Sequence, residues 1–181
     1  MSGELLVVID MQRAYMPCGA WETPGFTRAE GNILRLCEGY AQRVFTRHVP
    51  YADPPGTWRA YNEMFRAINE DAEAARLSPR LGRIAETVFD KSTYSALASG
   101  GLYEYIVRGG YGELLLCGVQ SEFCVLATMM DAVDRGLPVA LVTDACAGST
   151  EALCRVPAEI AALMPCQVRL TTTEEALYGR D

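Results

Sequence analysis

The sequence lacks an apolar run of the length that a membrane-spanning helix requires, which is about 20 residues. The first apolar run covers only residues 5–9 and is bounded by acidic residues at positions 4 and 10. A secretory signal peptide begins with basic residues and carries a longer apolar segment, so we expect none here. We therefore expect no membrane partner for this protein.

Basic side chains are also scarce relative to acidic ones. Sixteen arginine and lysine residues stand against 23 aspartate and glutamate residues, which gives a formal net charge of −7. Nucleic acids and anionic membranes bind proteins through basic faces. The charge balance therefore argues against a nucleic-acid partner, and a role in keeping the surface soluble explains it adequately.

Paired cysteines with the spacing of metal sites or disulfide frameworks are absent from the sequence as well. The seven cysteines are odd in number and scattered along the chain. Because disulfide scaffolds are typical of secreted proteins, this pattern favours a reducing compartment, and we expect a cytoplasmic location. The length of 181 residues suits one well-buried domain and is short for two, so we expect a single domain over residues 1–181.

Short apolar runs alternate with amphipathic segments along the chain. This alternation predicts a parallel sheet with helices on both faces. The expected fold class is α/β, a three-layer αβα Rossmann-like fold with a six-stranded, mostly parallel sheet. We expect strands near residues 4–10, 43–46, 87–91, 113–119, 138–142 and 167–170, and helices near residues 27–42, 58–75, 102–108, 122–135 and 151–163.

Three of the expected strands lead into side chains that can do chemistry. Asp10 follows the first strand, Lys91 ends the third, and Cys124 lies just beyond the fourth. Since the carboxyl ends of parallel strands share one edge of a sheet, we expect these residues to converge. A carboxylate, an ammonium group and a thiol in one cleft supply a base, a cation and a nucleophile.

The position of Cys124 favours the role of nucleophile. With Ser121 as the N-cap, Cys124 would be the third residue of a helix, near unpaired backbone N–H groups and the positive end of the helix dipole. Both effects lower the pKa of a thiol, so we expect a reactive thiolate. The alternative is a buried cysteine that packs like a small apolar side chain.

The sequence resembles the isochorismatase-like cysteine hydrolases, the superfamily that includes nicotinamidases and N-carbamoylsarcosine amidohydrolases. Five segments carry the resemblance in the expected order: VVIDMQ at 7–12, FTR at 45–47, FDKSTYS at 89–95, CGVQSEFCV at 117–125 and VTDA at 142–145. The resemblance implies that Asp10, Lys91 and Cys124 form a catalytic triad. It also implies a cis peptide bond between Val119 and Gln120, with the backbone N–H groups of Gln120 and Cys124 as the oxyanion hole.

The resemblance also bears on metal binding. Nicotinamidases of this superfamily bind a divalent ion through an Asp-x-His pair after the second strand and a further histidine. The matching positions here are His48 and Pro50, and the sequence contains no other histidine. We therefore expect no metal and no other cofactor. His48 itself is expected to be structural, and the alternatives are a place in the pocket wall, a hydrogen bond to the insertion or a catalytic imidazole.

Aromatic and amide side chains near the three strand ends predict the wall of a small-molecule pocket. Residues 58–75 form a polar helical insertion that would cover the site or meet a second subunit, and the resemblance implies a homo-oligomer, either a dimer or a tetramer. Gln120 joins the wall as a hydrogen-bond partner, and Arg47 or Arg59 could hold an anionic tail. The expected substrate-binding residues are Gln12, Tyr15, Trp58, Tyr61, Tyr94 and Phe123.

The leading hypothesis is a metal-independent cysteine hydrolase that cleaves a C–N bond of a small amide, ureido or carbamoyl substrate through a thioester. Two alternatives stay open. One is hydrolysis of the vinyl ether of isochorismate, whose enzymes in this superfamily do not require the cysteine, so Cys124 argues against it. The other is a redox-sensing thiol, which needs no positioned carboxylate such as Asp10.

Overall fold

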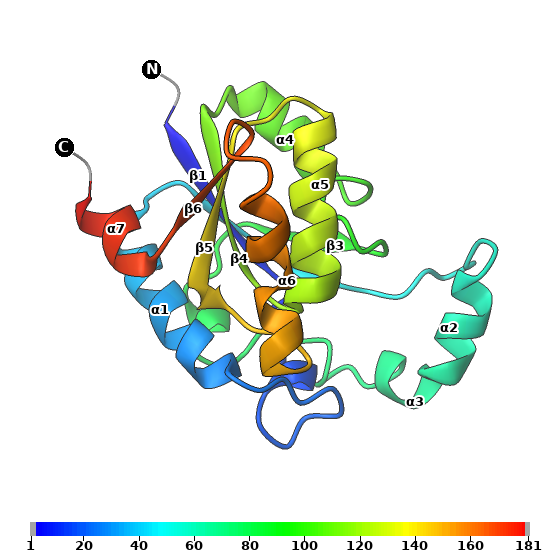
Figure 1. Cartoon of the computed structure of the whole chain (residues 1–181). Coiled ribbons are helices and arrows are strands. Elements are labelled where there is room, and N and C mark those ends of the chain that lie inside the picture. The colour runs from blue at the N-terminus through cyan, green and yellow to red at the C-terminus, as the bar shows by residue number, and fades with distance from the viewer. Residues whose placement is uncertain (1–2, 180–181) are drawn as a thin grey trace.

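The computed structural model describes residues 3–179 and contains a six-stranded sheet in the order β3-β2-β1-β4-β5-β6 (Figure 1). All neighbouring strands pair in parallel, so the sheet is fully parallel rather than mostly parallel. The strands are β1 (Glu4–Ile9), β2 (Arg43–His48), β3 (Val88–Lys91), β4 (Glu113–Gly118), β5 (Val139–Cys146) and β6 (Val168–Thr171).

Helices cover both faces of this sheet, which confirms the α/β class and the three layers. In Figure 1, α1 and α7 lie on one face, and α4, α5 and α6 lie on the other. The helices are α1 (Phe26–Gly39), α2 (Trp58–Met64), α3 (Arg66–Asn69), α4 (Leu102–Gly109), α5 (Leu126–Asp134), α6 (Glu151–Ala161) and α7 (Thr173–Tyr178). Within residues 3–179, no helix is long and apolar enough to cross a membrane.

In the sequence, the central strands are continuous apolar runs, and their burial on both faces explains this pattern. Leu5, Leu6, Val8 and Ile9 of β1 are all fully buried. A strand at the centre of a parallel sheet is covered by helices on both faces, so side chains pointing in either direction must be apolar. The run stops at Asp10, where the chain leaves the sheet.

Three differences from the sequence-based expectation have local causes. The fifth strand continues to Cys146, because a register shift in its pairing with β4 lets Cys146 face Gly118. The segment 58–75 is two short helices followed by turns rather than one helix. A final helix, α7, was not expected, although Thr172 and Glu175 form a capping box at its start.

The pair of short helices α2 and α3 projects from the sheet at the end of an extended loop (Figure 1). Neither helix contains a fully buried residue. Tyr61 and Phe65 of this segment nevertheless line the cavity described below. The insertion therefore covers part of the site, which is one of the two roles that the sequence analysis allowed for it.

Candidate active site

Three strand ends bring Asp10, Lys91 and Cys124 into contact. The Lys91 Nζ atom lies 2.7 Å from the Asp10 Oδ2 atom and 3.4 Å from the Cys124 Sγ atom. The exposed fractions of the three residues are 0%, 2% and 5%. The structure therefore places together the three residues that strand-end reasoning had selected, and it buries them almost completely.

Asp10 is fixed by its backbone and by a threonine on the neighbouring strand. Its φ angle of 49° lies in the left-handed region, which aspartate tolerates better than most residues. Its N–H donates to the Thr46 Oγ1 atom at 3.2 Å, and the Thr46 hydroxyl donates to the Asp10 Oδ1 atom at 2.6 Å. Oδ2 is thus left for Lys91 and the thiol. Sequence reasoning had not identified Thr46.

Lys91 is the only lysine in the sequence, and it is buried beside two anionic or acidic partners. Its Nζ atom also donates to the Thr93 carbonyl oxygen at 2.9 Å. Burial alone would lower the pKa of the ammonium group, but the charges of Asp10 and Cys124 outweigh burial and raise that pKa. Lys91 is therefore a permanent cation between the carboxylate and the sulfur atom.

The pKa of the Cys124 thiol is raised to about 12, contrary to the sequence-based expectation of a lowered value. Burial is the main cause and the Asp10 carboxylate is the second, while Lys91 acts in the opposite direction. The local geometry also differs: Gln120 is the N-cap, and Cys124 is the fourth residue of a π-helical turn, Ser121–Val125. The free site therefore holds a neutral thiol next to a carboxylate that can take its proton.

The backbone before this turn has an unusual geometry. The peptide bond between Val119 and Gln120 is cis, at the position where the resemblance placed one. The N–H groups of Phe123 and Val125 both donate to the Gln120 carbonyl oxygen, at 3.1 and 3.2 Å. The N–H groups of Gln120 and Cys124 take no part in these two bonds.

Gly118 is required for the close approach of β4 to β1 just before the turn. Its φ angle is 120°, and a Cβ atom there would lie 2.1 Å from the Ile9 carbonyl oxygen. A larger residue could not be accommodated without moving one of the two strands. Gly118 therefore helps to set the position of the turn relative to Asp10.

Cys124 opens into a cavity of about 350 Å³. Five residues of the expected wall lie there: Tyr15, Tyr61, Tyr94, Gln120 and Phe123. Each of the three tyrosines has its pKa raised, chiefly by burial and in part by Cys124. Within residues 3–179, no arginine, lysine, aspartate or glutamate lines this cavity. Its lining residues are Tyr15, Trp21, His48, Tyr61, Phe65, Tyr94, Gln120, Phe123, Cys124 and Ser149.

Two residues that the sequence analysis expected to bind substrate, Gln12 and Trp58, do not line the cavity. The Gln12 amide donates to the carbonyl oxygens of His48 and Ala75 and accepts from the His48 N–H. Its hydrogen bonds therefore go to backbone groups rather than to a substrate. Trp58 does not line the cavity, although its ring packs against Tyr94 at a centroid distance of 5.0 Å.

The two arginines proposed for an anionic tail do not reach the cavity either. Arg47 forms two hydrogen bonds to the Asp90 carboxylate, at 2.7 and 2.8 Å, and lines a different hollow. Arg59 is exposed and is not part of the cavity wall. Conversely, Trp21, Phe65 and Ser149 are wall residues that sequence reasoning missed, because their approach to the site depends on the path of loops.

His48 lies in the cavity wall, which was one of the alternatives to a structural role. It is 7% exposed, and neither ring nitrogen has a hydrogen-bond partner. Its pKa is lowered to about 4, mainly by burial and further by the Lys91 charge, while Asp10 opposes the shift. The imidazole is therefore neutral at physiological pH.

The lowered pKa of His48 predicts a pH-dependent part of the stability. Because the folded protein disfavours the protonated ring, His48 contributes its full stabilisation above the unfolded pKa of 6.5. That contribution, about 3 kcal/mol, is lost as the pH falls from 6.5 toward 4. We expect the free energy of unfolding of the native protein to fall more than that of His48→Gln between about pH 7.5 and about pH 4.5. Denaturant titrations at both pH values measure the difference, and equal losses would contradict the assignment.

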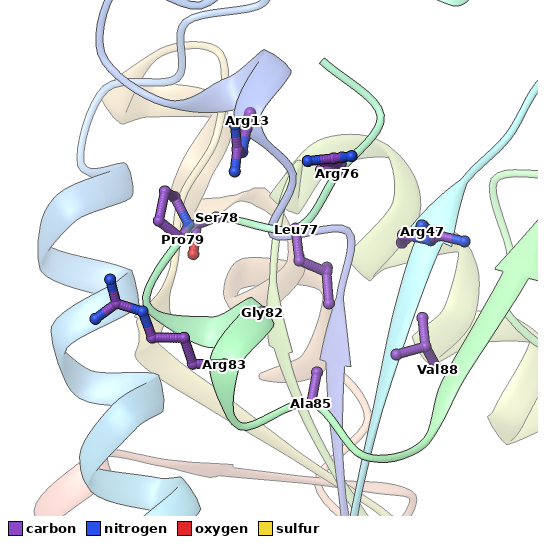
Figure 2. Close-up of a pocket in the computed structure, with 10 residues that line it drawn as sticks. All are labelled: Arg13, Arg47, Arg76, Leu77, Ser78, Pro79, Gly82, Arg83, Ala85 and Val88. Carbon is purple, nitrogen blue, oxygen red and sulfur yellow. The ribbon is translucent and has the colours of Figure 1, made fainter. Parts of the chain in front are cut away.

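A larger groove, of about 560 Å³, lies elsewhere on the molecule. Figure 2 shows its arginines arranged around Leu77. Arg13 and Arg76 pair with Glu73, and Arg47 pairs with Asp90. Ser78 is the one hydroxyl among the residues that line the groove, and no carboxylate or imidazole lines it there to act as a base, so we assign the candidate site to the smaller cavity. No cluster of three or more histidine, cysteine, aspartate or glutamate residues in the described part of the chain could hold a metal ion.

Comparison with known proteins identifies the same family that the sequence motifs indicated. The family model described as the isochorismatase domain matches residues 4–175. An uncharacterized isochorismatase family protein of Bacillus subtilis is 30% identical over 148 residues, which cover 80% of this chain and 78% of that protein. An Arabidopsis thaliana protein named as a probable inactive nicotinamidase is 28% identical over 158 residues, covering 80% of this chain and 81% of its own.

Solved structures share the fold at lower sequence identity. A cysteine hydrolase from Pseudomonas syringae pv. phaseolicola 1448A has a TM-score of 0.83 at 20% identity, covering 96% of this chain and 90% of that chain. N-carbamoylsarcosine amidase from Thermoplasma acidophilum has a TM-score of 0.77 at 20% identity, covering 96% of this chain and 98% of its own. At such identities the likeness establishes the fold, and the chemistry has to be argued from the site.

Proposed function

The chain belongs to the isochorismatase family, and from this premise we propose that it is a metal-independent cysteine hydrolase of a small amide, ureido or carbamoyl compound. The observation that supports the proposal most is the contact of Asp10, Lys91 and Cys124 at the cavity. A base, a cation and a nucleophile within hydrogen-bond reach are what acyl transfer requires.

In the proposed first half-reaction, Asp10 accepts the proton of the Cys124 thiol as the sulfur attacks the carbonyl carbon of the substrate. The raised pKa of that thiol makes this transfer necessary, because little thiolate exists before substrate binds. The tetrahedral intermediate then collapses, the C–N bond breaks, and protonated Asp10 returns its proton to the departing nitrogen. Ammonia or an amine leaves, and an acyl group remains on sulfur as a thioester.

In the second half-reaction, water attacks the thioester carbonyl while Asp10 takes one of its protons. The C–S bond breaks, the acid product leaves, and the proton returns to sulfur. Lys91 stays protonated throughout and stabilises negative charge on the Asp10 carboxylate or on the sulfur, since it touches both. The cycle regenerates the starting protonation states.

The oxyanion of each tetrahedral intermediate needs donors, and we assign this role to the backbone N–H groups of Gln120 and Cys124. Gln120 and Cys124 both line the cavity. Fixed backbone donors of this kind stabilise the developing charge without reorganising during the reaction.

The proposal of metal independence rests on the donor set of the chain. His48 is the single histidine, and it occupies the position where metal-binding relatives need an aspartate. A divalent ion of this family would require several nitrogen or oxygen ligands at one point. The only imidazole lies among aromatic rings instead, including Trp58 and Tyr61.

Features of the site disfavour both alternative functions. Isochorismate is a dicarboxylate, and no cationic side chain among the described residues lines the cavity wall. A redox-sensing thiol is typically exposed and has a low pKa. Cys124 is 5% exposed and has a raised pKa.

The experiment that tests the proposal is release of ammonia or amine from a panel of small carboxamides, ureido compounds and carbamoyl amino acids, with and without EDTA. We expect turnover of at least one class that survives EDTA and is absent from Cys124→Ala. Turnover abolished by EDTA would contradict metal independence. No release from any compound of the panel, together with hydrolysis of isochorismate in a separate assay, would move the function to the vinyl-ether reaction.

A further inference from the structure

Four arginine side chains gather at one groove of a protein whose net charge is −7. This groove is the larger one, of about 560 Å³, and it is called the arginine groove below. Arg13, Arg47, Arg76 and Arg83 form its charged wall (Figure 2). Among residues 3–179, no aspartate, glutamate or histidine lines it, and it shares no lining residue with the catalytic cavity. The arginine groove is therefore a separate feature of the molecule, with a positively charged wall.

Segments that are distant in the sequence bring these arginines together. Arg13 follows β1, Arg47 lies in β2, and Arg76 and Arg83 belong to the segment before β3. The Arg13 N–H donates to the Arg76 carbonyl oxygen at 2.8 Å, which holds the segment before β3 against the end of β1. The fold itself thus builds the groove, and its arginines are gathered before any ligand binds.

Three of the arginines have only one carboxylate between them. Arg13 and Arg76 both pair with Glu73. The Arg83 side chain forms no ion pair with any carboxylate in the part of the chain that the structure describes. Two positive charges of the groove therefore lack a negative partner. An anion is the ligand that supplies one, because guanidinium groups form their strongest hydrogen bonds with negatively charged oxygen atoms.

The ion pairs already present at the groove are open to water. The side chain of Glu73 is 58% exposed, and that of Asp90, which pairs with Arg47, is 48% exposed. Exposed ion pairs of this kind contribute little to stability. A phosphate group carries up to two negative charges and accepts paired hydrogen bonds from a guanidinium group. It can therefore compete with these carboxylates for the arginines.

The floor between the arginines is apolar. Figure 2 shows Leu77, Ala85 and Val88 among the arginine side chains. Val88 is 38% exposed although its side chain is apolar. An inorganic anion would leave this floor in contact with water, whereas the organic part of a phosphate ester would cover it. The volume of about 560 Å³ is within the range of small-ligand sites.

We propose that the arginine groove binds a small organic phosphate monoester, at a site separate from the catalytic cavity. The phosphate supplies the missing negative charge among Arg13, Arg76 and Arg83. The organic part lies over Leu77 and Val88. Mononucleotides and aryl phosphates share this chemistry. A nucleic acid is disfavoured, because the net charge of −7 repels a long chain of phosphates.

Calorimetric titration of the native protein with AMP and with phenyl phosphate, at low salt, tests the proposal. Adenosine and phenol are the matched compounds without phosphate, and inorganic phosphate is the matched compound without an organic part. We expect at least one ester to bind with a Kd below about 1 mM, and about tenfold or more tighter than both of its matched compounds. In Arg83→Gln the affinity for that ester should fall by about tenfold, because a charged hydrogen bond to phosphate is lost. Arg59→Gln, which changes an exposed arginine outside the groove, should leave the affinity unchanged.

Two further variants place the ligand in this groove. A Cβ atom at Gly82 would meet only Leu77, at 3.8 Å, so Gly82→Glu can fold while it adds a carboxylate to the groove. We expect this variant to lose binding and Cys124→Ala to retain it, with thermal unfolding to show that both are folded. Binding of neither ester, equal binding of the compounds without phosphate, full binding by Gly82→Glu, or loss in Cys124→Ala would each overturn the proposal. Equally tight binding of triglutamate that depends on Arg83 would overturn it in favour of an acidic peptide.

Discussion

Replacing Cys124 with serine is expected to lower kcat by about 10⁴-fold or more, the scale seen when a nucleophile is removed from a catalytic unit. Serine nearly matches cysteine in size, so the buried site should keep its shape. A serine hydroxyl is a much weaker acid than a thiol, and an aspartate such as Asp10 is too weak a base to activate it. The measurement is kcat on whichever compound of the panel the native enzyme hydrolyses, with thermal unfolding to show that the fold is intact.

Cys166→Ser provides the matched control for this substitution. Cys166 is a free, exposed cysteine that is not part of the cavity. The control should retain the activity of the native enzyme, which excludes a general effect of replacing cysteine with serine. Retention of more than one tenth of kcat in Cys124→Ser would refute the assignment of the nucleophile.

Asp10→Asn is expected to reduce both stability and turnover. The substitution preserves the shape of the side chain but leaves the Lys91 ammonium buried without an anion, which typically costs about 3–5 kcal/mol. It also removes the proposed general base, a loss of about 10²–10⁴-fold in rate. Denaturant unfolding and steady-state kinetics measure the two effects separately.

The double variant Asp10→Asn/Lys91→Met separates the two causes. With both charges removed, the buried pair becomes neutral, and stability should recover by several kcal/mol relative to Asp10→Asn, because replacing a whole ion pair is far less costly than breaking it. Activity should not recover, since neither base nor cation is present. A double variant no more stable than Asp10→Asn would show that the ion pair is not the source of the loss, and an active one would refute the roles of both residues.

The meeting of Asp10, Lys91 and Cys124 could be predicted because it depends on topology alone. Asp10 follows β1, Lys91 ends β3 and Cys124 lies in the turn after β4, and the carboxyl ends of parallel strands share one edge of the sheet. The sequence carried a further signal: apart from His48, every other basic residue is an arginine, and the single lysine is Lys91. A compact ammonium group suits a tight contact with both carboxylate and sulfur better than a guanidinium does.

The electrostatics of the site could not be read from the sequence. A helix start suggests a lowered thiol pKa, yet the pKa of Cys124 is raised, because burial and the neighbouring Asp10 outweigh the opposite effect of Lys91. The role of Gln12 likewise depends on which backbone groups lie near its amide after folding. Those groups, at His48 and Ala75, come from segments 36 and 63 residues further along the chain.

The central claim is that hydrolysis passes through a thioester on Cys124, and competition between water and hydroxylamine for that intermediate tests it most directly. Once a substrate is known, a series of amides with the same acyl group and different leaving amines would be hydrolysed in the presence of hydroxylamine. The account predicts that the ratio of hydroxamate to acid is the same for every leaving amine, because all of them form one common acyl-enzyme. A ratio that changes with the leaving amine, or turnover at the normal rate without any hydroxamate, would contradict it.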